Sequence, residues 1–141
     1  MTENIVISQE TKKTILKIQQ KEITEQAIYM NLAKKVKKQS DKELLERIAK
    51  EEKYHCELWS KYTGKNPKPQ RLKVLLYSFL SIIFGYTFVI KIMEKNEGVS
   101  KETYRKLAEE VPIATKIYAD EQRHEHALIG MLDEDRLQYV G

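Results

Sequence analysis

Two stretches of the sequence repeat one pattern, in which a glutamate lies 27 residues ahead of a Glu-x-x-His motif. The residues of the pattern are Glu25, Glu52 and His55 in the first stretch, and Glu94, Glu121 and His124 in the second. On an α-helix three residues advance by about 300°, so each Glu and His three apart share one face. Two antiparallel helices joined near the midpoint of the 27 residues would bring both glutamates to one level. The pattern therefore predicts two helical hairpins that face each other.

Apolar spacing and turn residues place the first hairpin at about residues 8–63. Isoleucine, alanine and methionine recur at near-helical intervals over residues 8–39, which predicts a long first helix. Ser40 followed by Glu43 fits a capping box at the start of a second helix. We expect this helix to run to about Tyr62 and to end at Gly64.

A stiff connector with two prolines, residues 64–70, leads to a second hairpin at about residues 71–132. Its first helix, the third of the chain, is expected to start near Arg71, to be interrupted at Gly98 and Ser100, and to resume over residues 101–110. Pro112 suits the first turn of a fourth helix that ends near Leu132. Residues 1–141 therefore predict one all-α domain, an antiparallel four-helix bundle with an interrupted third helix.

Residues 74–90 form a run of 17 residues without a charge. A membrane-spanning helix needs roughly 20 apolar residues, and this run contains several tyrosine, serine and threonine side chains. The run is better explained by a helix buried in the bundle or in a dimer interface, with a membrane-facing surface as the alternative. Because large exposed apolar patches are unusual, we expect a homodimer whose interface includes this segment.

Composition excludes several other classes of protein. The single cysteine, Cys56, permits neither an internal disulfide nor a four-cysteine iron or zinc site, and it fits a reducing compartment. The net charge of +4 is mild, and no nucleic-acid-binding motif accompanies it. The N-terminus lacks the pattern of a signal peptide. We therefore expect a cytoplasmic location, with the cytoplasmic face of a membrane as the more specific alternative.

The repeated motifs together supply four carboxylates and two imidazoles. Oxygen and nitrogen donors of this kind suit iron or manganese better than a soft metal, and carboxylates can bridge two ions. One Glu-x-x-His motif alone is a weak signal, because both residues are common on helix surfaces. Its repetition at equal spacing from an upstream glutamate favours a two-metal site over aligned surface charges.

This ligand pattern resembles the ferritin-like superfamily, and within it the rubrerythrin group, over nearly the whole chain. The resemblance implies a centre of two iron ions, for which manganese or zinc can substitute. It assigns as metal ligands Glu25, Glu52, His55, Glu94, Glu121 and His124, with Glu97 as an additional ligand. It also implies that Glu51 and Asp120 hydrogen-bond the ligand histidine of the opposite hairpin, although both could be solvated acids.

Four further residues near these motifs have weaker assignments. Tyr29 lies on the ligand face and either bonds to a ligand carboxylate or packs in the core. Glu22 shares that face but is expected to be solvated. His126 is two residues beyond His124, about 200° around the helix, and is expected at the surface. Trp59, four residues after His55, is interpreted as core packing.

Residues 88–94, 108–112 and 132–141 resemble a narrower group, in which a ferritin-like domain precedes a membrane transporter of the vacuolar iron transporter type. That resemblance implies a domain that captures, oxidises or senses Fe²⁺ for an attached iron or manganese transporter, as its soluble portion. Ferroxidase activity is one implication, but no catalytic residue is assigned. The alternative is a stand-alone peroxidase or oxidase of the rubrerythrin kind. It would need an external electron donor, because the chain cannot form a four-cysteine rubredoxin module.

Overall fold

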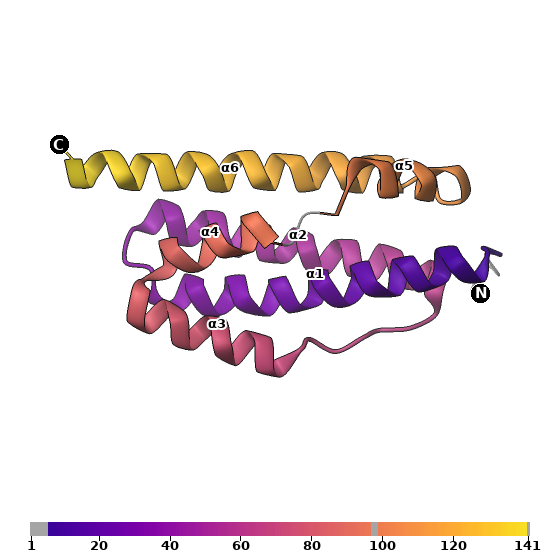
Figure 1. The fold of residues 1–141 in the computed structure, drawn as a ribbon, viewed down its shortest axis with the longest axis horizontal. Coiled ribbons are helices and arrows are strands. Elements are labelled where there is room, and N and C mark those ends of the chain that lie inside the picture. Colours follow the sequence, from indigo (N-terminus) through magenta and orange to yellow (C-terminus); the bar gives the residue numbers. More distant parts are fainter. Residues whose placement is uncertain (1–5, 97–98, 141) are drawn as a thin grey trace.

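The computed structural model describes residues 6–96 and 99–140, and all regular structure in those ranges is helical. The elements are α1 (Gln9–Lys35), α2 (Gln39–Thr63), α3 (Arg71–Phe84), α4 (Tyr86–Asn96), α5 (Lys101–Glu110) and α6 (Ala114–Val140) (Figure 1). The all-α class predicted from the sequence is therefore confirmed. Over the described ranges, no helix is both long and apolar enough to cross a membrane.

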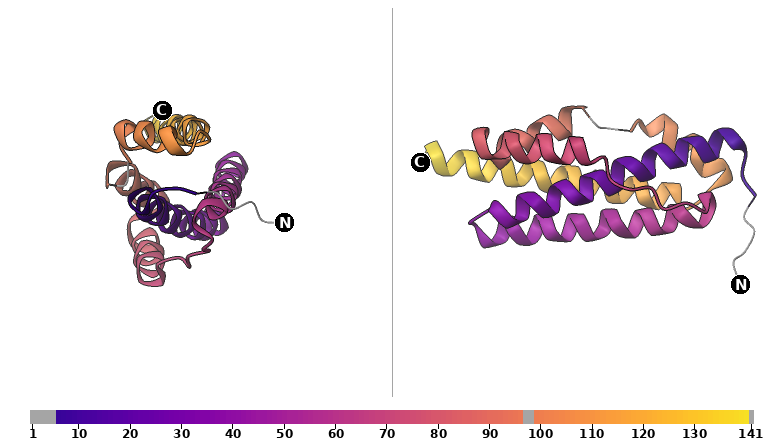
Figure 2. Two further views of the ribbon diagram at one scale, coloured as in Figure 1. Left: turned by 90° about the vertical axis from the view of Figure 1, so that its right-hand side faces the viewer. Right: turned by 90° about the horizontal axis from the view of Figure 1, so that it is seen from below.

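The hairpin of α1 and α2 follows the predicted boundaries at its outer ends. Ser8 caps α1 by accepting a 3.2 Å hydrogen bond from the backbone N–H of Thr11. Gly64 ends α2 in the left-handed conformation, with φ of 69°, which glycine adopts without steric cost. The two helices lie side by side and antiparallel in both Figure 1 and Figure 2.

The turn between α1 and α2 lies earlier than the sequence predicted. α1 ends at Lys35, and Val36 is only 7% exposed because it packs into the hydrophobic core. The next helix begins at Gln39, and no side chain caps it. Ser40 therefore lies inside the first turn of α2, and the predicted capping box at that serine is wrong. Burial of Val36 fixes the turn at this point.

The uncharged run of residues 74–90 is divided between two helices. Gly85 has φ of 90° and separates α3 from α4, which pack against each other as an antiparallel pair (Figure 1). The prediction of one helix through this run is therefore wrong. Gly85 is the only glycine in the run, and this backbone conformation is strained for residues with a Cβ atom.

α4 ends at Asn96 and α5 begins at Lys101, where Ser100 caps the helix by accepting a hydrogen bond from the backbone N–H of Thr103. Gly98, the other predicted breaker, lies outside the described residues. Pro112 stands in the turn before α6, which begins two residues later at Ala114. α6 continues to Val140, beyond the predicted end near Leu132.

Two apolar clusters form the core at opposite ends of the long helices. The first joins parts of α1, α2, α3, α4 and α6, and its most deeply buried large members include Ile28, Leu32, Leu45, Ile48, Ile90, Met93 and Leu128. The second includes Ile15, Ile18, Trp59, Tyr104, Leu107 and Ile117. Between these clusters each long helix carries a short polar segment, and the polar segments of α1, α2 and α6 meet.

Candidate metal centre

The polar segments of three helices form one buried layer of acids and histidines. Its members are Glu22 and Glu25 on α1, Glu52 and His55 on α2, and Asp120, Glu121 and His124 on α6. All except Glu121 are less than 9% exposed, and the side chain of Glu121 is 21% exposed. Ionisable groups seldom occur together in a protein interior unless they pair or bind a cation.

Each histidine contacts the acids of the opposite motif. His55 Nδ1 lies 3.0 Å from Oε1 of Glu121, and His55 Nε2 lies 2.9 Å from Oδ2 of Asp120. His124 Nδ1 lies 2.9 Å from Oε1 of Glu52. The imidazole rings are stacked, with centroids 6.0 Å apart and planes inclined by 25°. The two Glu-x-x-His motifs therefore face each other across α2 and α6.

The acids that precede the motif glutamates each lie beside the Nε2 atom of the histidine on the opposite helix. Asp120 hydrogen-bonds His55, as the resemblance led us to expect. Oε2 of Glu51 lies 3.1 Å from His124 Nε2, but the geometry is not that of a hydrogen bond. Arg123 forms an ion pair with Asp120 and lies 3.9 Å from Glu51, so its guanidinium links these two acids.

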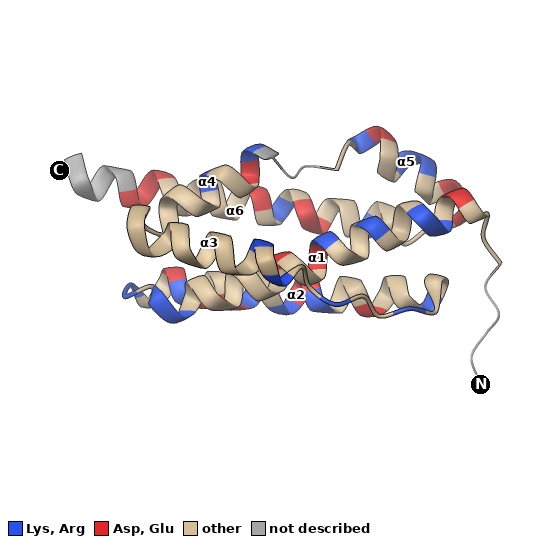
Figure 3. Cartoon of the chain, turned by 60° about the horizontal axis from the view of Figure 1, so that its bottom comes forward, with Lys and Arg blue, Asp and Glu red and all other residues tan. Residues whose placement is uncertain are grey.

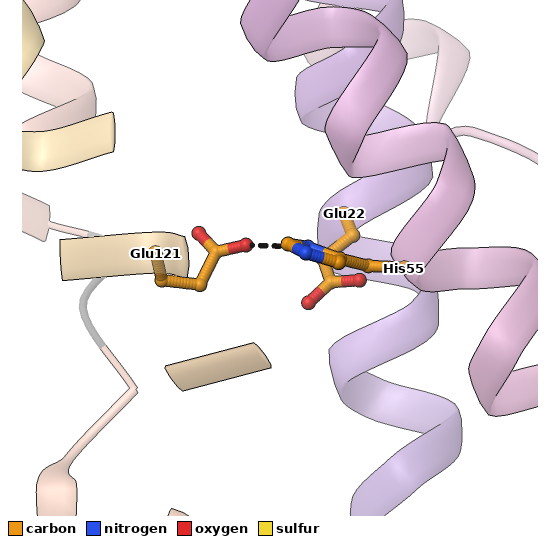
Figure 4. Close-up of side chains that lie close together, drawn as sticks. All are labelled: Glu22, His55 and Glu121. Atoms are coloured by element: carbon orange, nitrogen blue, oxygen red, sulfur yellow. Dashed lines mark hydrogen bonds and ion pairs between the residues drawn. The ribbon is translucent and has the colours of Figure 1, made fainter. Parts of the chain in front are cut away.

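Two groups of side chains present ligand atoms close enough to surround a cation. Glu22, His55 and Glu121 form the first group, whose ligand atoms all lie within 4.8 Å of one another (Figure 4). Glu52, Glu121 and His124 form the second by the same measure. Glu121 belongs to both groups, so a single carboxylate stands between two potential ion positions.

Three buried ligand atoms have no hydrogen-bond partner within the described part of the chain: Oε2 of Glu22, Oε2 of Glu52 and Nε2 of His124. Leaving such an atom unsatisfied costs about 1–3 kcal/mol, and more when the group is charged. The other oxygen of Glu22 accepts a 3.4 Å hydrogen bond from the indole of Trp59. The three atoms belong to residues of the two ligand groups, and a bound cation would satisfy the two carboxylate oxygens, while Nε2 of His124 lies 3.1 Å from Glu51.

Burial and mutual repulsion favour the neutral forms of two glutamates. Removal from water raises the pKa of both Glu22 and Glu52 well above the ordinary value, and the charges of Glu121 and Glu25 raise it further. Carboxyl groups that repel one another in this way are good ligands for a divalent cation, because the ion neutralises them together.

The contact between His55 and Glu121 contributes to a lowered pKa of this acid, whereas the pKa values of Glu22 and Glu52 are raised. Burial raises the pKa of Glu121, but hydrogen bonds with His55 and Glu52 and the charges of His124 and Lys21 together lower it by more, so the net shift is downward. Burial also lowers the pKa of His55, but hydrogen bonds to Glu121 and Asp120 raise it overall. The contacts of both ring nitrogens of His55 with Glu121 and Asp120 therefore hold the three side chains together.

Glu22 corrects the sequence prediction. It was expected to be solvated, but it is 1% exposed and belongs to the first ligand group. Glu25, the predicted ligand, is 7% exposed and accepts a 2.8 Å ion-pair hydrogen bond from Lys21, and neither ligand group includes it. The register of the hairpin indicates a position for Glu22 in the site. An antiparallel pairing that sets Glu25 level with Glu52 also sets Glu22 level with His55.

The remaining predicted residues lie close to the layer or outside the described residues. Tyr29 is 2% exposed, and burial followed by the charges of Glu25 and Glu94 raises its pKa. Glu94 is half-buried on α4 and belongs to neither ligand group. Glu97 lies outside the described residues. His126 is exposed, as its helical position predicted.

No protein-family model, curated protein or solved structure matches the chain. The candidate centre therefore rests on the geometry of its own residues.

Proposed function

We propose that this chain is a ferritin-like metal-binding domain that holds two divalent ions, with iron as the favoured metal. In this proposal α1, α2 and α6 are three members of a four-helix bundle, and α4 with α5 forms the interrupted third member. Support comes from the buried layer of acids and histidines, which lies where the three long helices meet. α3 is an addition outside the bundle.

The observation that carries the proposal is the shared carboxylate of Glu121. It stands between a group with Glu22 and His55 and a group with Glu52 and His124. A bridging carboxylate with nitrogen and oxygen donors on each side suits a pair of iron or manganese ions, and zinc can bind the same donors. The charge of Glu25 acts on Glu52, and the charge of Glu94 acts on Tyr29, a turn beyond Glu25 on α1.

The chain's own residues define what the centre can do. Bound iron would supply electron transfer to O₂ or peroxide. The apolar clusters on both sides limit access of water, and the carboxylates balance the charge of the ions. A cation held by a ring nitrogen of His55 would displace a proton bound there, so uptake of a cation would be coupled to proton release. Asp120 is placed to hold the other ring nitrogen and so to orient the imidazole.

In this proposal the domain captures, oxidises or senses Fe²⁺ for an iron or manganese transporter in the membrane. This part of the proposal rests on the resemblance of residues 88–94, 108–112 and 132–141 to the corresponding segments of transporter-linked domains.

The test is anaerobic loading with Fe²⁺ followed by addition of O₂, with the absorbance of ferric iron as the readout. We expect oxidation in the parent protein and in His126→Ala, whose side chain is exposed, and slow or no oxidation in Glu121→Gln. Equal rates in the parent and Glu121→Gln would refute oxidation at this centre. Rapid oxidation by peroxide, with turnover only when a reductant is added, would instead favour the peroxidase alternative.

A further inference from the structure

α3 turns a mixed polar and apolar side to the rest of the protein, where Val74 and Leu80 also pack against the core, and a wholly apolar side to the exterior. Tyr77 and Ser81, four residues apart, are its buried residues. Lys35 of α1 donates hydrogen bonds to the hydroxyl groups of Ser78 and Ser81, at 2.7 Å and 3.0 Å, and to the carbonyl of Ser78. These contacts fix the rotation of α3 about its axis and leave its opposite side uncovered.

The uncovered side is a continuous apolar stripe. Its members are at least half exposed and recur at helical spacing: Leu72, Leu75, Leu76, Phe79, Ile82 and Ile83, followed by Phe84. With Phe88 they make up eight of the eleven large hydrophobic residues that are exposed in the described part of the chain. In the end-on view of Figure 2, α3 lies at the edge of the molecule opposite α5 and α6. A concentration of this kind marks an interaction surface.

The segment of the sequence that contains this stripe carries charge of one sign. Residues 58–93 contain six lysine or arginine residues and no acid, so they carry +6, and the rest of the chain carries −2 to give the total of +4. Lys65, Lys68 and Arg71, at and before the start of α3, are exposed. In Figure 3 the ribbon of α3 is tan over most of its length, with basic residues near its first turn.

The helices packed against α3 add no exposed acid near the stripe. On α1, Glu22 and Glu25 are buried, and the exposed Glu10 lies in its first turn, at the opposite end from Lys35. On α4 the only acid is the half-buried Glu94. The surface around the stripe is therefore complementary to an anionic partner.

We propose that α3 docks the protein on an anionic lipid bilayer, lying in the plane of the surface. The apolar stripe enters the boundary between headgroups and acyl chains, and the neighbouring cations contact lipid phosphates. A second copy of the chain is the other occupant that a stripe of this kind suits. A twofold contact would, however, set the basic residues beside the stripe, Lys65, Lys68 and Arg71, against their copies, so charge favours the lipid.

The experiment is flotation of the full chain with two kinds of vesicle. One is phosphatidylcholine alone, and the other contains equal parts of phosphatidylcholine and phosphatidylglycerol. We expect binding to the mixed vesicles, weak binding to the neutral ones, and a loss of binding as salt is raised, because added salt screens exposed charges. Equal binding to both kinds of vesicle would overturn the assignment of an anionic surface.

A matched pair of variants separates α3 from the remaining surface. Ile82 on α3 and Ile129 on α6 are 72% and 44% exposed, so glutamate at either position makes the same chemical change on the exterior. Ile82→Glu should weaken vesicle binding by at least roughly tenfold, because it removes apolar contact and adds a repelled charge. Ile129→Glu should bind as the parent does. Circular dichroism checks that both variants keep their helix content.

Light scattering completes the test, because it measures whether a second copy of the chain, the alternative occupant, binds to the stripe. A dimer that becomes a monomer on Ile82→Glu, together with no binding to either vesicle, would assign the stripe to a second copy and overturn the proposal. Equal vesicle binding by Ile82→Glu and Ile129→Glu would overturn it as well. Neither variant touches the candidate metal centre, so these outcomes are independent of metal binding.

Discussion

Glu22 and Glu25 offer the sharpest contrast in this protein, because they lie one turn apart on α1 and both are buried. Glu22 belongs to a ligand group and has one oxygen without a partner, whereas Glu25 is paired with Lys21. We predict that Glu22→Gln raises the stability of the metal-free protein, because it removes an acid whose charged form is disfavoured first by burial and then by the charges of Glu121 and Glu25. The same change should reduce the stabilisation that metal provides.

The size of the effect follows from binding linkage. Free metal at 100 times its dissociation constant stabilises the folded state by about 2.7 kcal/mol for one site. For a chain of 141 residues, about 4 °C per kcal/mol is a reasonable conversion, so Tm should rise by about 11 °C. If Glu22→Gln weakens binding about 100-fold, roughly 0.4 kcal/mol remains at that site, which corresponds to a rise of about 2 °C.

The assay is thermal unfolding with and without Mn²⁺, or with Fe²⁺ under anaerobic conditions, for the parent, Glu22→Gln and Glu25→Gln. Both variants exchange one buried carboxylate for an amide on the same helix, so each is the control for the other. We expect the metal-induced shift in Tm to be small in Glu22→Gln and closer to that of the parent in Glu25→Gln.

The reverse result would refute the reasoning. A lost shift in Glu25→Gln with a full shift in Glu22→Gln would mean that Glu25 is the ligand, as the spacing of the motifs first indicated. A full shift in both variants would show that neither acid of α1 holds the metal.

Two further predictions concern α6 and the end of the molecule near the α1–α2 turn. His124→Ala should weaken metal binding at least roughly tenfold, while His126→Ala should bind as the parent does, and parallel Fe²⁺ titrations measure both. Asp41 is 3% exposed and shares the hydroxyl of Tyr86 with Asp135, and burial together with Asp135 raises its pKa. Stability from the protonated Asp41 is present below the ordinary aspartate pKa of about 3.9 and is lost as pH rises through the raised value. The Tm of Asp41→Asn minus that of the parent should therefore increase from acid to neutral pH, and a constant difference would contradict the assignment.

Local signals in the sequence predicted the ends of several helices. Ser8 and Ser100 cap helices, and Gly64 ends one, because each feature depends on a side chain or a backbone conformation that one residue provides. The division at Gly85 was not predicted. Glycine is tolerated inside helices as well as in turns, and only the packing of α3 against α1 and α4 decides between the two.

The candidate centre was predicted in part. The repeated Glu-x-x-His motifs led to the pairs of glutamate and histidine that the structure brings together across α2 and α6. The choice between Glu22 and Glu25 could not be made from spacing, because both lie on the same face of α1. It depends on the hairpin register and on Lys21, which pairs with Glu25.

Elemental analysis after anaerobic Fe²⁺ loading and removal of excess metal tests the central claim most directly. The parent protein and the double variant Glu52→Ala/Glu121→Ala, which removes ligands from both groups, are compared under the same conditions. We predict about two iron ions per chain in the parent, as in dimetal carboxylate bundles, and close to none in the double variant. An equal iron content in the two proteins, or no iron in the parent, would contradict a two-metal centre at these residues.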